Sequence, residues 1–322
     1  MQFTIFGSGS LGTIVAGHLL KAGHRVRVVA RGERASYLER RGLVVTGLAE
    51  FSEPCTVVKE VDTDRDNDVL IFAVKTYQMI SALKATEKLR PRVVFSLANG
   101  LKKNELLKVQ FPHSKVLGCM ANFSGELLND GTVEFSRNVA LNLDGRNLDG
   151  RELSKIITES GIPTNPDNEI ESTEWSKFTS WIPLFSLSLI TRSPIGQFLS
   201  IKEFATEAYF IIREVASLAE KNNVSLHDGT VLPVLTLSKA SLDRGVKELM
   251  AIGRNFLDCY PNHRISALQD LENRKRLEVH ETLGHVIDMA KRHNVDLKFT
   301  PFIYRVIAGL DKLNQSCLLR SA

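Results

Sequence analysis

The sequence predicts an α/β protein in which an amino-terminal doubly wound parallel sheet is followed by a second, mostly α-helical domain. Strand-like and helix-like patterns alternate through the first half of the chain, and its strand-like runs are almost continuously apolar. Such runs are typical of strands that are buried on both faces of a parallel sheet. From about residue 151 long amphipathic helical patterns replace them.

The first half contains the expected elements of a doubly wound sheet in order. A short strand over residues 3–6 leads through glycines into a helix from Leu11 to Ala22, which Gly23 ends. A second strand is expected over residues 26–30. Further apolar runs predict strands of the same sheet at residues 68–74, 92–97 and 115–119. This alternation predicts a doubly wound domain.

The second half is expected to be mostly helical, with amphipathic patterns over residues 203–221 and 277–292. Pro163, Pro166 and two asparagines interrupt both periodicities, which places the boundary near Asn165 to Asn168. We therefore expect one domain over residues 1–166 and another over 167–322. A length of 322 residues accommodates two domains of ordinary size.

Composition and charge exclude several classes of protein. A hydrophobic content of 43% supports an ordinary core and argues against a disordered or fibrous chain. Lys and Arg number 41 against 37 Asp and Glu, and the basic residues form no run that could follow a phosphate backbone. We therefore expect no nucleic-acid partner.

Cysteine spacing and hydropathy predict a cytoplasmic protein with no membrane partner. The four cysteines stand far apart without a CxxC pair, as expected of reduced thiols. No apolar run approaches the roughly 20 residues that span a bilayer, and the first residues lack the basic region of a signal peptide. No histidine pairs with a second ligand at a recognised metal-site spacing, so we expect no metal; the histidines considered are His227, His263, His280 and His285.

A glycine-rich motif follows the first predicted strand. Its residues, Gly7, Ser8, Gly9, Ser10, Leu11 and Gly12, fit GxGxxG and open the first helix, which is the context of a Rossmann-type dinucleotide site. Glycines allow the tight turn, the approach of the pyrophosphate and close packing of helix on strand, and the helix N-terminus supplies amide donors.

The end of the second strand favours NADPH over NADH. NAD-selective sites usually place Asp or Glu there to bind the ribose hydroxyls, whereas this chain has Arg31. A guanidinium suits a 2′-phosphate. Arg34 adds a second positive charge, whereas the carboxylate of Glu33 is the one feature that argues against a bound 2′-phosphate. The alternative is that Arg31 is only a solvated loop residue.

Several motifs in order resemble the ketopantoate reductase (2-dehydropantoate 2-reductase) family. They are the glycine motif, Arg31, Ala73-Val74-Lys75, Ala98-Asn99-Gly100, Trp175-Ser176-Lys177 at a helix start, Ser266-Ala267-Leu268-Gln269-Asp270 and Leu277-Glu278-Val279. The resemblance runs nearly end to end. It implies a Rossmann domain followed by a helical domain, and NADPH-dependent reduction of a 2-oxo acid in pantothenate biosynthesis; a homo-oligomer is compatible with it.

The resemblance also implies roles for individual residues. Lys177 would be the general acid, Glu278 a partner for the reacting oxygen or the cofactor, and Lys75 would lie by the nicotinamide. Asn99 would contact cofactor and substrate, and Ser266 the substrate. The reduction of a ketone requires groups of the same kind. Hydride transfer to the carbonyl carbon leaves an alkoxide, which needs a proton donor within hydrogen-bond reach.

Two departures from the family leave the substrate open. Trp181 and Phe185 stand where the family has asparagines four and eight residues after the lysine, which favours an apolar pocket for a bulkier 2-oxo acid. These rings are equally typical of a helical core. Ser266 and Glu278 share a site only if the chain bends between them, and the wholly polar run 272–276 is the expected place.

Structural alternatives remain for the other candidates. Ser266 with Gln269 fits a capping box, Asn99-Gly100 is a turn signal, and Lys177 near Glu174 fits an exposed ion pair. Two other functions stay open as well. One is a non-catalytic NADPH-binding sensor or partner-binding protein, and the other a dehydrogenase of another hydroxy acid.

Overall fold

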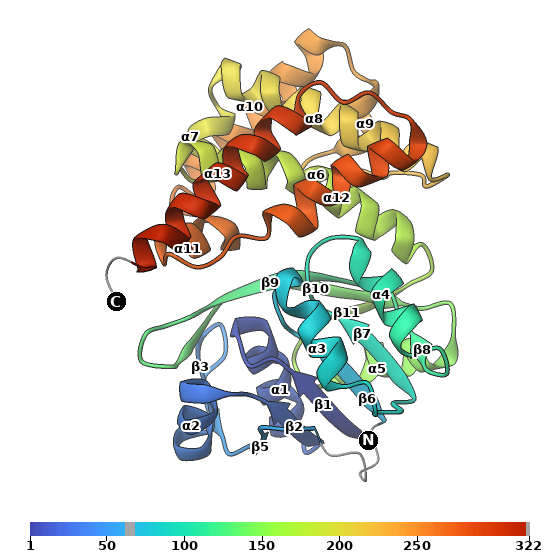
Figure 1. The fold of residues 1–322 in the computed structure, drawn as a ribbon, viewed down its shortest axis with the longest axis vertical. Coiled ribbons are helices and arrows are strands. Elements are labelled where there is room, and N and C mark those ends of the chain that lie inside the picture. Colours follow the sequence, from blue (N-terminus) through green and yellow to red (C-terminus); the bar gives the residue numbers. More distant parts are fainter. Residues whose placement is uncertain (62–67, 320–322) are drawn as a thin grey trace. The chain divides into compact units, whose positions relative to one another are not determined.

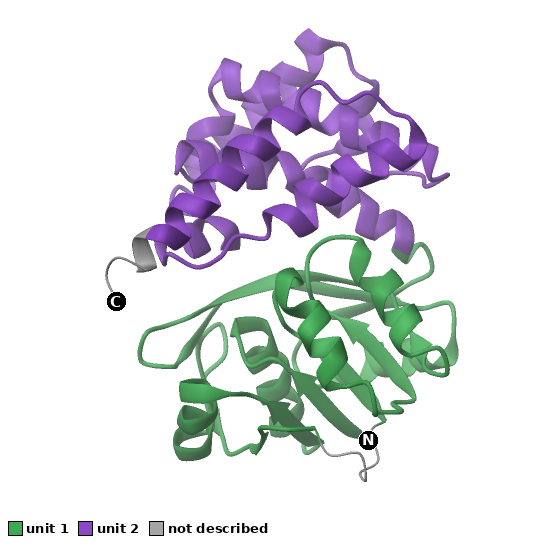
Figure 2. Ribbon diagram, viewed as in Figure 1, with its two compact units in different colours: residues 1–170 green, residues 171–322 purple. Residues whose placement is uncertain are grey.

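The computed structural model describes residues 1–61 and 68–319. The chain divides into two compact units, residues 1–170 and 171–322 (Figure 2). The division falls a few residues after the boundary expected between 166 and 167. In the described part of the chain, no helix is long and apolar enough to cross a membrane.

Unit 1 contains the predicted parallel sheet (Figure 1). Its six strands lie in the order β5-β2-β1-β6-β7-β8, and every neighbouring pair is parallel. The strands are β1 (Gln2–Phe6), β2 (Arg25–Val29), β5 (Thr56–Val58), β6 (Val69–Phe72), β7 (Val93–Ser96) and β8 (Lys115–Val116). The doubly wound sheet expected from the apolar runs is confirmed.

Helices cover both faces of this sheet. The helices of unit 1 are α1 (Ser10–Lys21), α2 (Gly32–Arg41), α3 (Met79–Ala85), α4 (Lys102–Gln110) and α5 (Leu148–Glu159), and the 3-10 turn η1 (Thr76–Gln78) precedes α3. Successive side chains of a strand point to opposite faces, so Ile5 packs with the α1 cluster and Phe6 with the cluster of α3 and α4. Both faces are therefore buried, which explains the continuous apolar runs.

A second, mixed sheet in unit 1 was not predicted. Its strands lie in the order β11-β10-β3-β4, and β9 pairs with β10 in the longest antiparallel ladder. The strands are β3 (Leu43–Gly47), β4 (Phe51–Glu53), β9 (Cys119–Leu127), β10 (Val133–Asp144) and β11 (Thr164–Asp167). The proline-containing stretch expected to interrupt the periodicity includes β11, an edge strand, where a proline costs no ladder hydrogen bond.

Unit 2 is helical in its described residues, as expected. Its helices are α6 (Ile170–Thr191), α7 (Ile195–Leu199), α8 (Lys202–Lys221), α9 (Val234–Lys239), α10 (Leu242–Cys259), α11 (Ser266–Glu272), α12 (Val279–His293) and α13 (Thr300–Leu319). A buried cluster of α7, α8 and α10 includes Phe198, Ile212 and Leu249. The helix that carries Lys177 begins at Ile170, not at Trp175, so Lys177 lies well inside the helix.

Candidate cofactor-binding and catalytic sites

The strand register brings the candidate cofactor residues to one edge of the parallel sheet. Phe6 pairs with Val29 and with Phe72, and Phe72 pairs with Ser96, so these strand ends are level. The chain continues from them into the glycine loop, Arg31, Lys75 and Asn99, each reached within three residues of its strand. Parallel strands thus present all four segments at their carboxyl ends, where dinucleotides bind in folds of this type.

The structure explains the presence of glycine differently at each of the three glycine positions of the motif. Gly7 has φ +107°, and a Cβ there would lie 2.7 Å from the Ala73 carbonyl oxygen. A Cβ at Gly12 would lie 2.0 Å from the Gly7 oxygen. A Cβ at Gly9 would meet no atom within 4 Å. Packing therefore demands Gly7 and Gly12, whereas Gly9 faces open space.

The N-terminus of α1 is suited to an anion. Gly9 is its N-cap, no side chain caps it, and its first turn holds no acidic residue. The first backbone hydrogen bond of the helix joins the Thr13 amide to the Gly9 oxygen at 2.9 Å. The amides before Thr13 have no intrahelical partner, so they and the helix dipole favour a negatively charged group.

Arg31 is exposed and is the N-cap of α2, directly beyond β2. Glu33, the contrary charge, is also exposed, in the first turn of that helix. Arg34 is half-buried, and its guanidinium bonds protein oxygens. Of the two arginines considered for the 2′-phosphate, Arg31 is thus the exposed one.

Lys75 and Asn99 occupy the turns after β6 and β7. Lys75 is half-buried at the N-cap of η1, where its amide bonds the Gln78 side chain at 3.2 Å. Asn99 is half-buried, and Gly100 after it has φ +84°. The turn expected at Asn99-Gly100 is therefore present, which is compatible with a binding role for the asparagine.

Lys103, which sequence reasoning missed, supports the Asn99 turn. Its side chain is buried with a relative exposure of 6%. The ammonium donates to the Ala98 oxygen at 2.9 Å and to the Cys119 oxygen at 2.6 Å. A buried lysine after a polar helix start carries no sequence signal that separates it from its exposed neighbour Lys102.

The candidate catalytic residues belong to unit 2. Lys177 is half-buried on α6, and Glu278 is buried, with a relative exposure of 5%, at the N-cap of α12. Ser266 is exposed at the first position of α11. The N-cap of α11 is Ile265, without a side-chain cap, so Ser266 is not the N-cap and the alternative of a capping box with Gln269 is wrong.

The bend expected between Ser266 and Glu278 is confirmed. The helix α11 ends at Glu272, and Arg274 adopts the left-handed conformation with φ +54°. Asp311 of α13 has a relative exposure of 3%, and its Oδ1 accepts the Leu277 amide at 2.8 Å. Asp311, another residue that sequence reasoning missed, thereby fixes the chain next to Glu278.

The aromatic residues that follow Lys177 on α6 differ in exposure. Phe185 is fully buried, Trp181 is half-buried, and their ring centroids lie 4.7 Å apart. The interpretation of Phe185 as a core residue is therefore supported. The Ser180 hydroxyl on the same helix accepts the Leu232 amide at 3.0 Å, which ties a loop of unit 2 to α6.

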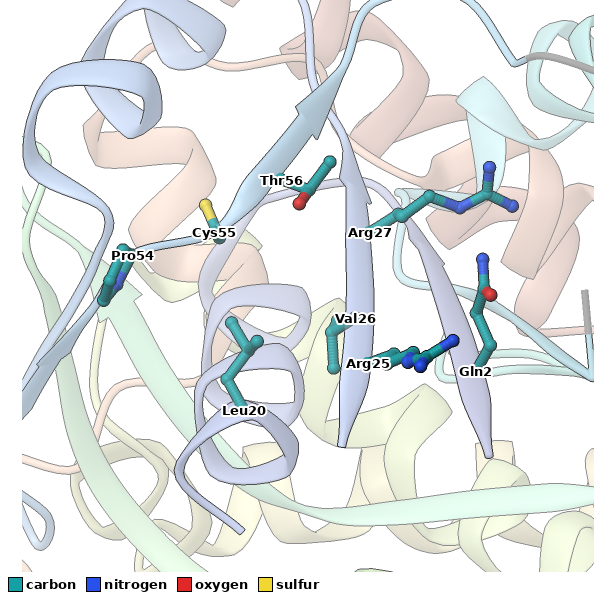
Figure 3. A pocket seen from close by; sticks show the side chains of 8 residues that line it. All are labelled: Gln2, Leu20, Arg25, Val26, Arg27, Pro54, Cys55 and Thr56. Carbon is teal, nitrogen blue, oxygen red and sulfur yellow. The ribbon is translucent and has the colours of Figure 1, made fainter. Parts of the chain in front are cut away.

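A surface cavity of about 540 Å³ lies elsewhere on unit 1 (Figure 3). Gln2 and Arg25, at the amino ends of β1 and β2, line it together with residues that include Arg27 and Cys55. The glycine loop is at the opposite ends of these strands, so this cavity is not the candidate cofactor site. Within the described residues, no group of His, Cys, Asp and Glu could hold a metal ion.

Comparison with known proteins agrees with this organisation. The family model for ketopantoate reductase PanE/ApbA matches residues 3–146, and the model for the C-terminal part of the same family matches residues 169–311. A 2-dehydropantoate 2-reductase of Archaeoglobus fulgidus is 27% identical over 313 residues, which cover 95% of this chain and 97% of the relative.

Solved structures share the fold along almost the whole chain. A PanE/ApbA family ketopantoate reductase from Ralstonia eutropha JMP134 has a TM-score of 0.84 at 21% identity, covering 98% of this chain and 100% of that one. A D-mandelate dehydrogenase with NADH and anilino(oxo)acetate has a TM-score of 0.83 at 18% identity, covering 98% and 99%. With both halves matched by its models, the chain belongs to the ketopantoate reductase family.

Proposed function

We propose that the protein is an NADPH-dependent reductase of a 2-oxo acid. The observation that carries this proposal is the sheet edge of unit 1, where an open glycine loop and an uncapped helix N-terminus lie level with Arg31. Gly9 leaves space for a pyrophosphate, and the amides of the first turn of α1 fit its charge. The residues present thus fit a dinucleotide, and Arg31 suits its 2′-phosphate.

The nicotinamide cofactor supplies a hydride to the substrate carbonyl. The chain has to bind the acid, orient its ketone and deliver a proton to the oxygen. Lys177 is proposed to donate that proton from its ammonium, and Glu278 to orient the ammonium. Asn99 and Lys75 are proposed to hold the nicotinamide end and Ser266 the acid.

The substrate is proposed to carry a bulky apolar group. Trp181 is half-buried one helical turn beyond Lys177, and its ring packs at a tilt against Phe185. It offers an apolar surface, whereas an amide at this position would favour a hydroxylated substrate. A structural neighbour is a D-mandelate dehydrogenase with NADH and anilino(oxo)acetate. Oxidation of an aromatic 2-hydroxy acid is therefore the second candidate, and it uses the same residues in reverse.

Turnover with a substrate panel tests the reaction. NADPH oxidation is followed with ketopantoate and with branched and aromatic 2-oxo acids, and NADP reduction with the matching hydroxy acids. We expect the highest kcat/KM for a branched or aromatic acid. Tight NADPH binding without turnover on any member would contradict the reductase and favour a nucleotide sensor.

Two variants test the residues. Lys177→Ala should lower kcat by about two to four orders of magnitude, as loss of a general acid does, with NADPH affinity unchanged. Arg31→Ala should weaken NADPH binding by about 10-fold to 100-fold and leave NADH binding as it is, because only NADPH has the 2′-phosphate. Equal affinity of the unaltered protein for both nucleotides would refute the cofactor preference.

A further inference from the structure

Arg34 of α2 donates hydrogen bonds to three neutral oxygens around the glycine loop. Its Nε donates to the Ser8 carbonyl at 2.9 Å, and its Nη2 to the Thr13 hydroxyl at 2.8 Å. Its Nη1 donates to the Gly131 carbonyl at 2.5 Å, in the turn between β9 and β10. One side chain thus joins the glycine loop, the first turn of α1 and the hairpin of the second sheet.

These bonds fix the orientation of the peptide between Ser8 and Gly9. The Ser8 oxygen accepts from Arg34 and also from the Thr13 hydroxyl, at 3.2 Å. In a planar trans peptide the carbonyl and the next amide point in opposite directions. Because the Ser8 carbonyl points toward Arg34, the Gly9 amide points away from it. Of the three motif glycines, Gly9 is the one with open space at its Cβ position.

The charge of Arg34 is not neutralised by the groups that hold it. In residues 1–61 and 68–319, its hydrogen-bond acceptors are two carbonyls and a hydroxyl, and its guanidinium also lies 5.0 Å from the centroid of the Tyr37 ring. Half-burial of a cation without a carboxylate is costly. Guanidinium remains charged in proteins, so a positive potential persists beside the glycine loop.

Arg34 also connects the two ends of the expected nucleotide site. It lies one turn into α2, whose N-cap is Arg31. Its bonds to Ser8 and Thr13 therefore hold the start of α2 against the start of α1. The distance between the pyrophosphate-binding loop and Arg31 depends on this connection.

We propose that Arg34 is a positioning residue for the dinucleotide, which turns the Gly9 amide outward and adds positive charge beside the pyrophosphate. This inference rests on the proposed function, because it requires that a nucleotide binds at the loop. It differs from the role of Arg31, since the pyrophosphate is common to NADPH and NADH. Loss of Arg34 should therefore weaken both nucleotides, whereas loss of Arg31 should weaken NADPH alone.

Titration of nicotinamide fluorescence tests this difference in Arg34→Gln and Arg34→Lys, with Arg40→Gln as the control. Arg40 is exposed on the same helix. In Arg34→Gln, the Kd values of NADPH and NADH should rise by about tenfold or more and by similar factors, which is the loss expected for a charged hydrogen bond. Arg34→Lys keeps the charge without the planar fork, so its loss should be smaller. Arg40→Gln should bind both nucleotides normally.

Steady-state kinetics separate positioning from a general loss of structure. Arg34→Gln should raise the KM for NADPH and keep kcat at saturating NADPH, whereas a misfolded fraction would lower kcat at every concentration. Unchanged affinity in Arg34→Gln, or weakening of NADPH alone, would overturn the inference. An unaltered protein that binds neither nucleotide would overturn the proposed function as well.

Discussion

Lys103 offers a direct test of how the turn that carries Asn99 is held. Replacement by Met keeps the apolar stem of the side chain and removes the ammonium that bonds the Ala98 and Cys119 carbonyls. Lys102→Met is the matched control, because Lys102 precedes it on α4 and is exposed. Both variants lose one positive charge, so their difference isolates the buried hydrogen bonds.

The expected magnitude follows from these two bonds. A hydrogen bond to a charged group contributes roughly 1.5–3 kcal/mol. The two bonds share one ammonium, and Met avoids the cost of burying its charge, so their contributions do not add fully. We expect Lys103→Met to lower the free energy of unfolding of unit 1 by about 2–4 kcal/mol. Lys102→Met should stay within about 0.5 kcal/mol of the unaltered protein.

The placement of the tryptophans lets urea unfolding report on the units separately. The chain has two, Trp175 and Trp181, and both lie on α6 in unit 2. Tryptophan emission therefore follows unit 2, whereas far-ultraviolet circular dichroism follows both units. Lys103→Met should move the dichroism transition to lower urea and weaken NADPH binding. If it unfolds at the same urea concentration as Lys102→Met by both probes, the ammonium does not stabilise the turn.

Three further predictions concern other polar groups. Glu214 of α8 accepts the amides of residues 298, 299 and 300 at the start of α13, so Glu214→Ala should destabilise unit 2 by about 2 kcal/mol in tryptophan-detected unfolding. Asp311→Ala should release the amide before Glu278 and lower kcat about tenfold while the NADPH Kd stays constant; a parallel loss of NADPH affinity would contradict this assignment. Burial lowers the pKa of His18, and Lys21 lowers it further. Below about pH 6.5 the unfolded chain therefore binds more protons than the folded chain, so the free energy of unfolding should decrease as the pH is lowered. This decrease should be less steep in His18→Asn than in a variant of the exposed His113.

The parallel sheet and the glycine loop could be predicted because their signals are local. Each central strand is buried on both faces, so apolar residues fill consecutive positions, and the helices between strands show their own period. Gly7 and Gly12 are required by contacts with their immediate structural neighbours. The bend between Ser266 and Glu278 was likewise visible as a polar interruption between two amphipathic helices.

The second sheet left no comparable signal. One of its ladders joins β10 to β3, a strand from a distant part of the chain, and part of the surface of β10 is exposed. The resulting burial pattern is irregular, and β11 even contains a proline. Strand pairing of this kind depends on which segments meet, and a single segment does not encode its partner.

The amino-acid sequence by itself determined the strands of the parallel sheet and the helical character of the second half, and it placed the glycine motif and Arg31 at the ends of two of those strands. Tertiary structure alone decided the polar contacts between remote positions: Arg34 with Gly131, 97 residues apart, and Lys298 with Glu214, 84 residues apart. Periodicity records how often a chain returns to an apolar environment. A hydrogen bond between two residues that are far apart in the chain leaves no periodic pattern in the sequence, so it can be identified only in the folded structure.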